Sequence, residues 1–446
     1  MGSTRQFGCV LISALAVLLA PAAASAAEVT RVASSFDEQD AFDLDFLAGF
    51  SRTQHRGKIT RERHQEGRIA DVIELRYTRI EQAMPLWLAI GLYQDLELHA
   101  GTRFVFNDDR SWGYPGLDPQ GRPVTNDANS TIFNNCITPR GQLVHPDCQG
   151  DRRVGAQPIF AVPGQAFRGG LDDVTVGLKY ALFNEVRDDT KPTWTLGFDY
   201  TMPTAAVNDP SRPTSEANRG NIGTKVHRFQ FTTALSKRLG AVDPYALFSY
   251  TLPTQAPNFF TNCQNPGLLG YAENCGVGPW TARETGIRAP HVANLLFGSE
   301  FYAYDDPDKH QRVGFDIRGH IRYTSEGRAY NELSDALGKL LYTEEYLTVG
   351  GTFGIYAGIG SEHVQMRLLL NASLFHDTEH FLTNESVGKD LDGACKGDTS
   401  SRCVDLDNRA NEINPNFDFR YDMPGRRFRI SEVNTFNIMA RAMISF

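Results

Sequence analysis

Apolar and polar residues alternate along much of this sequence, and this pattern limits the possible folds more strongly than any other feature. The segment that ends at the C-terminus shows the alternation best. One set of alternate positions is apolar: Phe436, Ile438, Ala440, Ala442, Ile444 and Phe446. The intervening positions are Thr435, Asn437, Met439, Arg441, Met443 and Ser445. A period of two over this length predicts a β-strand with one apolar and one wet face.

The same alternation recurs through the chain and predicts about twelve strands. It is clear over 174–182, 194–202, 313–323 and 364–374. The segment 71–92 is long enough for two strands, and 414–421 could form another. The expected strands lie near 42–53, 71–92, 95–106, 172–184, 192–203, 224–237, 242–253, 290–304, 311–323, 341–357, 362–376 and 429–446.

The N-terminus has the features of a secretory signal. Arg5 is the only charge in the first 27 residues, and an apolar run follows from Cys9 to Ala20. The sequence Ala24-Ser25-Ala26 then matches a cleavage site, so residues 1–26 are expected to be removed before Ala27. An N-terminal membrane anchor is the alternative, but the apolar run is too short to span a bilayer.

Composition and charge exclude several classes of protein. The chain has 44 basic and 53 acidic residues, so it lacks the basic surface of a nucleic-acid-binding protein, and no nucleic-acid partner is expected. After the signal, no apolar stretch is long enough for a transmembrane helix. A transmembrane β-barrel remains possible, because only every second residue of its strands must be apolar. A soluble β-sandwich also alternates, but its strands are usually shorter.

Export, long alternating strands and a terminal phenylalanine together predict an all-β protein of the bacterial outer membrane. Residues 27–446 would form one antiparallel transmembrane β-barrel that contacts outer-membrane lipid. Phe446, with apolar residues at every second position before it, resembles the signal read by the barrel-assembly machinery. That machinery is therefore an expected partner.

The connections between the expected strands alternate in length. Short ones fall near 93–95, 188–191, 240–243 and 305–309. Long ones fall near 107–171, 254–289 and 377–428. In outer-membrane barrels the short turns face the periplasm and the long loops face outside, and this rule assigns the two ends of the molecule.

Six cysteines remain after the signal, and they form three local couples within the long loops. An exported chain with such an even set predicts disulfides that close the loops, each stabilising by roughly 3 kcal/mol. A zinc site would need four ligands brought together, and no Cys-x-x-Cys occurs. The expected bridges are Cys136–Cys148, Cys263–Cys275 and Cys395–Cys403.

With the apolar faces turned to lipid, the inward faces carry many charges. Such charges must meet water or pair with one another. One hypothesis is a salt-bridged network that fills a narrow lumen; the other is a selectivity lining with a basic wall formed by Arg318, His320, Arg322, Arg367 and Arg441. The expected lumen-lining residues are Glu97, Arg103, Lys179, Asp199, Arg228, Glu300, Asp316, Arg318, His320, Arg322, Arg367 and Arg441, with Asp43, Asp45 and His99 on the same faces.

The sequence holds none of the common catalytic motifs. Gly-x-Ser-x-Gly, His-Glu-x-x-His and the phosphate-binding Gly-x-x-x-x-Gly-Lys are all absent. His376 and His380 form the nearest metal-like cluster, but their spacing is better explained as the end of a strand. We therefore expect no enzyme activity, no metal and no cofactor.

One family resemblance adds a functional expectation. Asp172-Asp173-Val174-Thr175-Val176-Gly177-Leu178-Lys179-Tyr180, then Leu196-Gly197 and Met202-Pro203-Thr204, resembles the outer-membrane transporters described as the meta-pathway phenol-degradation family. The Tyr93–Leu98 turn is similar to that family's first hairpin. Ala205 departs from the family pattern, where glycine is frequent, and the 107–171 loop is unusually long.

The resemblance implies a channel for passive passage of small molecules, aromatic or apolar compounds among them. The alternative is a structural or adhesive barrel that acts through its disulfide-closed outer loops. Conductance separates the two hypotheses, because a pore passes current and a plugged adhesin does not.

Overall fold

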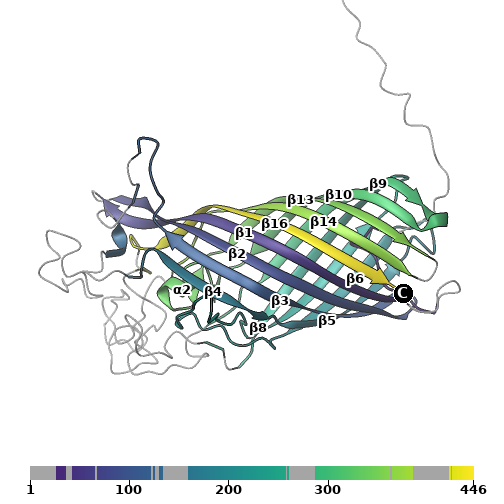
Figure 1. Ribbon diagram of the computed structural model, residues 1–446, viewed down its shortest axis with the longest axis horizontal. Helices are drawn as coiled ribbons and strands as arrows, with labels where there is room; N and C mark the ends of the chain where they lie inside the picture. Colours follow the sequence, from purple (N-terminus) through teal and green to yellow (C-terminus); the bar gives the residue numbers. More distant parts are fainter. Residues whose placement is uncertain are drawn as a thin grey trace, which may run out of the picture.

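The computed structural model shows an antiparallel β-sheet that closes on itself (Figure 1). It describes residues 27–36, 43–65, 68–121, 124–125, 130–133, 159–257, 259–260, 287–361, 364–384, 421–422 and 424–446. Twelve strands form the ring, which confirms the expected transmembrane barrel. In order around the ring they are β1 (Leu44–Gln65), β2 (Arg68–Tyr93), β3 (Leu96–Gly113), β5 (Val174–Phe183), β6 (Thr193–Met202), β7 (Val226–Ser236), β8 (Val242–Gln255), β9 (Val292–Asp306), β10 (Gln311–Thr324), β13 (Tyr346–Gly360), β14 (Gln365–Asp377) and β16 (Phe428–Ser445).

The first and last strands close the ring. β1 and β16 pair from Asp45 opposite Ser445 to Arg61 opposite Phe428. The backbones of Leu44 and Phe446 exchange two hydrogen bonds, at 3.1 and 3.0 Å. Closure satisfies the backbone groups along both strands, which a membrane requires because lipid offers no hydrogen-bond partners.

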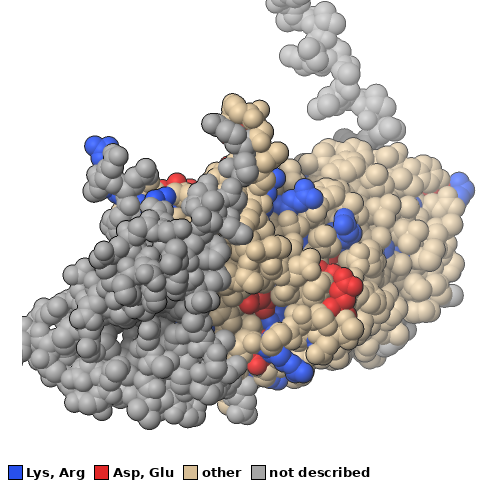
Figure 2. Space-filling model, turned by 60° about the vertical axis from the view of Figure 1, so that its left-hand side comes forward, with Lys and Arg blue, Asp and Glu red and all other residues tan. Residues whose placement is uncertain are grey.

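Large apolar side chains cover the outside of the barrel. Phe46, Leu178, Phe353, Leu370 and Ile438 are between 42 and 57% exposed. Figure 2 shows that most of the described barrel wall is uncharged, with charged side chains in a few small groups. Such a surface suits lipid, so the alternation in the sequence separates a lipid-facing from an inward face. Among the described residues, no helix is long and apolar enough to cross a membrane.

The first three strands continue beyond the predicted ends. β1 reaches Gln65 instead of 53, and β3 reaches Gly113 instead of 106. The outward residues of the β1 extension are polar, with Arg52 and Arg56 exposed. Because this part of the strand rises beyond the apolar band, its outer face need not be apolar. The alternation therefore disappears while the hydrogen-bond ladder continues.

Four other predictions about the strands and their connections need comment. The loop expected at 107–171 is too wide, because β4 (Gly164–Leu171) pairs with β3. The strand expected at 341–357 is divided into β12 (Leu341–Thr343), which pairs with β11 (Gly327–Ala329), and β13. The segment 71–92 belongs to one strand, β2, and 414–420 lie outside the described residues.

The end of the barrel with long connections carries a small apolar core of its own. The short helix α2 (Ser334–Leu337) packs there through Leu333, which contacts a cluster that includes Ile59, Leu75 and Phe428. In Figure 1, α2 lies toward the end opposite the C-terminus. The remaining short elements are η1 (Thr131–Phe133), η3 (Pro307–Lys309) and β15 (His380–Phe381).

Candidate functional site

Residues 27–36 enter the barrel at the end with short turns, and of these Phe36 is exposed beside Tyr93 at the end of β2. Arg31 donates hydrogen bonds to Asp45 at 2.8 Å and to Ser445 at 3.0 Å. Thr30 bonds Ser236 of β7, on another wall of the barrel, at 2.7 Å. A segment that contacts strands on all sides of a closed ring must occupy its lumen. We call residues 27–36 the plug segment.

Several expected lumen residues hold the plug segment by its backbone. The N–H of Ala33 donates to Glu97 at 2.8 Å, and Lys179 donates to the carbonyls of Val29 and Arg31. These bonds use the main chain of a segment without regular structure. They satisfy backbone groups that would otherwise be buried without partners.

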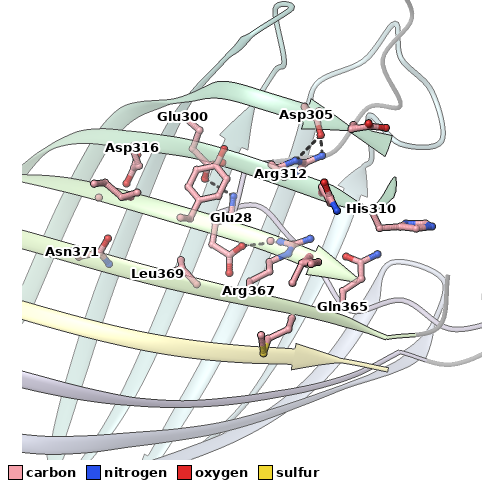
Figure 3. A pocket seen from close by; sticks show the side chains of 18 of the residues that line it. Glu28, Glu300, Asp305, His310, Arg312, Asp316, Gln365, Arg367, Leu369 and Asn371 are labelled. Atoms are coloured by element: carbon pink, nitrogen blue, oxygen red, sulfur yellow. Dashed lines mark hydrogen bonds and ion pairs between the residues drawn. The ribbon is translucent and has the colours of Figure 1, made fainter. Parts of the chain in front are cut away.

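Glu28 links the plug segment to the opposite wall (Figure 3). Its backbone N–H donates to Glu300 at 2.7 Å, and its carboxylate lies 3.1 Å from Arg367. Figure 3 shows the side chain between these two residues, which come from β9 and β14. The plug segment is therefore anchored by both charge and hydrogen bonds.

Two cavities flank Glu28. The first has a volume of about 330 Å³, and the second about 460 Å³. The expected residues on the first are Glu300, Asp316, Arg318 and Arg367. The expected residues on the second are Glu97, Arg103, Lys179, Arg228 and Arg441. Asp199, His320 and Arg322 line neither of these two cavities.

His99 sits at the centre of a charged group beside the second cavity. Its Nδ1 is 2.8 Å from Glu97, and its Nε2 is 2.6 Å from Asp199. The imidazole also packs against Trp87 in a tilted arrangement, with ring centroids 4.9 Å apart. Gly177 makes room for the group, because a Cβ there would lie 2.2 Å from the Asp199 carboxylate.

The residues expected to form a basic wall all lie on β10, β14 and β16, but not all carry an unbalanced charge. Arg318 forms an ion pair with Asp316 at 2.5 Å. Arg322 donates a hydrogen bond to the Thr348 hydroxyl at 3.3 Å, and His320 bonds the Thr352 hydroxyl at 3.1 Å. The Nε atom of Arg441 has no hydrogen-bond partner among the described residues.

A further group of ion pairs lies beside the second cavity. Arg103 pairs with Glu81 at 2.8 Å and with Asp172 at 2.5 Å. Arg228 lies 3.4 Å from Asp173. Asp172 and Asp173 separate β4 from β5, so these ion pairs bind the chain where the strand is interrupted.

The segment around α2 crosses the other end of the lumen. Asp335 forms an ion pair with Arg168 on β4 and lies 3.7 Å from Arg110 on β3. The ring of Tyr330 lies 4.1 Å from the Arg110 guanidinium. The segment leaves β10 and returns to β13, on the far side of the ring from β3. It therefore spans the mouth.

Sequence reasoning missed the plug segment and Trp87. Residues 27–36 show no period of two or of 3.6, and their charges Glu28 and Arg31 look like those of an ordinary leader to the first strand. Their partners range from Asp45, 14 residues from Arg31, to Ser445, 414 residues from Arg31. Trp87 lies on the inward face of β2, opposite Gly101, and that pairing could have been found only from the register.

The six cysteines of the expected disulfides lie outside the described residues, so their pairing stays a prediction. The same holds for cleavage of residues 1–26. Among the residues that the structure describes, no group of three or more His, Cys, Asp or Glu side chains could hold a metal ion.

The sequence matches no protein-family model and no curated protein. Solved structures do show similar barrels. An outer-membrane channel from Pseudomonas putida F1 is 10% identical, with a TM-score of 0.38, and the match covers 90% of this chain and 95% of that one. A FadL homologue from Pseudomonas aeruginosa is 8% identical, with a TM-score of 0.34 and coverage of 91 and 90%.

The outer-membrane protease OmpT from Escherichia coli is also similar, at 8% identity, a TM-score of 0.28 and coverage of 92 and 99%. At these values the neighbours do not distinguish a channel from a protease, so function has to be inferred from the lumen. What the strands, their closure and their apolar exterior establish is the architecture: the chain is a twelve-stranded β-barrel of the outer-membrane type.

Proposed function

We propose that this protein is a channel of the bacterial outer membrane for small molecules, closed in the present conformation by its own N-terminal residues. The observation that carries the proposal is the pair of cavities inside a closed barrel, on either side of Glu28. The plug segment, not the barrel wall, separates these spaces. Displacement of ten residues would therefore connect them without unfolding a strand.

The second cavity indicates the class of solute. Leu47, Trp87 and Met439 give it an apolar part, and Arg441, which forms no ion pair with a described residue, gives it a basic part. A molecule with an apolar body and one carboxylate, such as an aromatic acid, would match both. This proposal agrees with the aromatic compounds that the family resemblance implies.

The same geometry favours a channel over an enzyme. His99 is the histidine nearest to an active-site arrangement, but both of its ring nitrogens are held by carboxylates. A general base needs a nitrogen that can accept the substrate's proton. Because its ring also packs against Trp87, His99 is better suited to fixing the wall than to proton transfer.

Conductance in planar bilayers tests the proposal. A mature chain beginning at Ala27 should show small or infrequent steps, and a form beginning at residue 37 should show larger and longer ones. A double variant Glu28→Ala/Arg31→Ala keeps the full length but removes two anchors, so it should fall between them. Silence of all three folded forms would refute a channel and favour a barrel that acts through its outer loops.

Liposome swelling tests the solute class. We expect benzoate to enter faster than benzyl alcohol, which lacks the charge, and faster than acetate, which lacks the ring. Met439→Asp would place a negative charge beside Arg441 and should reduce the preference for benzoate. Equal entry of all three solutes would show a non-selective pore.

A further inference from the structure

Three carboxylates lie directly opposite one another on adjacent strands near the plug segment. Asp243 on β8 pairs in register with Glu300 on β9, which pairs with Asp316 on β10. Asp243 is 0% exposed, Glu300 6% and Asp316 4%. Like charges opposite one another destabilise a sheet, and buried charges need partners. A source of positive charge would therefore stabilise this acidic cluster, Asp243, Glu300 and Asp316.

Both arginines near the acidic cluster, Arg318 and Arg238, already pair with a carboxylate. Arg318 pairs with Asp316 at 2.5 Å. Arg238 acts on Asp243 from a distance, but its guanidinium binds Asp305 at 2.8 Å. The Oδ1 atom of Asp243 has no hydrogen-bond partner among the described residues. A buried, unpartnered carboxylate oxygen thus points to a missing ligand.

The first residues of the plug segment are directed at these same carboxylates. The backbone nitrogen of Ala27 faces Asp243, and the next N–H, that of Glu28, donates to Glu300 at 2.7 Å. Ala27 is completely buried and packs against Tyr245 and Leu296. The nitrogen of Ala27 therefore lies beside the neighbouring strands β8 and β9, which carry Asp243 and Glu300.

We propose that the α-ammonium group of Ala27, formed when the signal is removed, is the ligand of Asp243 and Glu300. Hydrolysis of the Ala26–Ala27 peptide bond consumes one water. It leaves a carboxylate on Ala26, which departs with the signal, and an amine on Ala27, which takes up a proton at neutral pH. An amide nitrogen with one donor thereby becomes a cation with three, enough to reach both carboxylates.

The inference rests on cleavage before Ala27 but on no particular solute. Before cleavage, the acidic cluster repels itself and the plug segment has one weak donor at this point. After cleavage, the segment carries its own counter-ion into the lumen. Export would thus be coupled to closure, because only the processed chain can complete the site.

Chemical reactivity of the amine tests the proposal. Folded mature protein is treated with acetic anhydride over a range of pH, and mass spectrometry of the N-terminal peptide gives the extent of labelling and the apparent pKa. Pairing with two carboxylates should raise that pKa by roughly one unit or more above the ordinary value of about 7.7–8.0. Labelling at neutral pH should fall by roughly tenfold or more relative to the urea-unfolded chain.

Three variants locate the effect. Asp243→Asn/Glu300→Gln removes the carboxylates and should return the amine to ordinary reactivity. One extra alanine before Ala27 leaves the acidic cluster intact but moves the ammonium by about 3.5 Å, so it should also expose the amine. Asp45→Asn, which weakens the Arg31 anchor instead, should leave the amine protected. A mature N-terminus at another residue, or equal labelling of wild type and Asp243→Asn/Glu300→Gln, would overturn the proposal.

Discussion

Gly177 faces the pair formed by His99 and Asp199, and its lack of a side chain is what admits that pair. A Cβ at this position would lie 2.3 Å from the His99 ring and 2.8 Å from a backbone oxygen. We expect Gly177→Ala to lower the free energy of unfolding by about 1–3 kcal/mol, since overpacking displaces the pair. The urea midpoint of the folded band on unboiled gels measures the change.

Gly197 provides the matched control for Gly177. It lies on the adjacent strand β6, and a Cβ there would approach nothing closer than 3.4 Å. Gly197→Ala should therefore leave the midpoint nearly unchanged. If the urea midpoint falls equally in both variants, the effect arises from replacing any glycine in a strand and not from the charged pair.

Arg441 tests whether the inward charges tune selectivity. Its side chain lines the second cavity, so the guanidinium can interact with a passing anion. In the form that begins at residue 37, Arg441→Ser should reduce anion preference, measured by reversal potentials in a salt gradient. Arg52→Ser removes the same charge from the outer face of β1 and should leave selectivity unchanged. Equal changes of the reversal potential in the two variants would indicate an effect of net charge alone.

At the scale of elements, strands and loops meet different requirements inside and outside the lipid. β1, β2 and β3 extend past the apolar band and enclose a small core with Leu333 and Phe428. The α2 segment is fixed over that core by Asp335, which is paired with the buried Arg168. Ion pairs therefore hold the α2 segment across the mouth, and the plug segment fills the end of the barrel with short turns.

Asp335→Asn should loosen the α2 segment. Breaking a buried ion pair by removing one partner costs about 3–5 kcal/mol, because Arg168 would keep a buried charge without its counter-ion. Trypsin should then cut after Arg328 or Lys339 faster than in the wild type. Glu345→Gln removes an exposed carboxylate just beyond the same segment and should not change the rate. Resistance of the Asp335→Asn variant would mean that the apolar core alone holds the segment.

At the scale of the whole molecule, closure between β1 and β16 decides stability, and Phe446 is the last residue of that seam. Its two bonds with Leu44 use the backbone, so Phe446→Ala should not prevent refolding in detergent. If the side chain is the assembly signal, the same variant should reach the outer membrane in smaller amounts. Heat-modifiable protein in membranes, compared with refolding yield, separates the two roles. Normal membrane levels would remove Phe446 as a signal.

The outer loops provide a further whole-molecule prediction. The three local bridges Cys136–Cys148, Cys263–Cys275 and Cys395–Cys403 should leave no free thiol. Neighbours within one loop can bring their α-carbons within about 7 Å, whereas cysteines of distant loops need not. Peptide mapping without reduction measures the pairing, and bridges between different loops would contradict it.

The sequence by itself determined the membrane-spanning strands and the faces they present. Lipid imposes an apolar residue at every second position, so positions such as Phe46 and Leu370 can be read one strand at a time. The sequence also indicated which charges face inward, among them Glu97 and Arg441. It did not indicate the ends of β1 and β3, because outside the lipid that requirement no longer applies.

Only the tertiary structure decided which charges pair and what fills the lumen. Asp199 meets His99 across 100 residues of sequence, and Glu28 meets Arg367 across 339. These contacts depend on strand register and on closure of the ring, which no local pattern contains. The plug segment has no periodicity because its partners surround it on strands from across the chain, and such an environment leaves no repeat in a sequence.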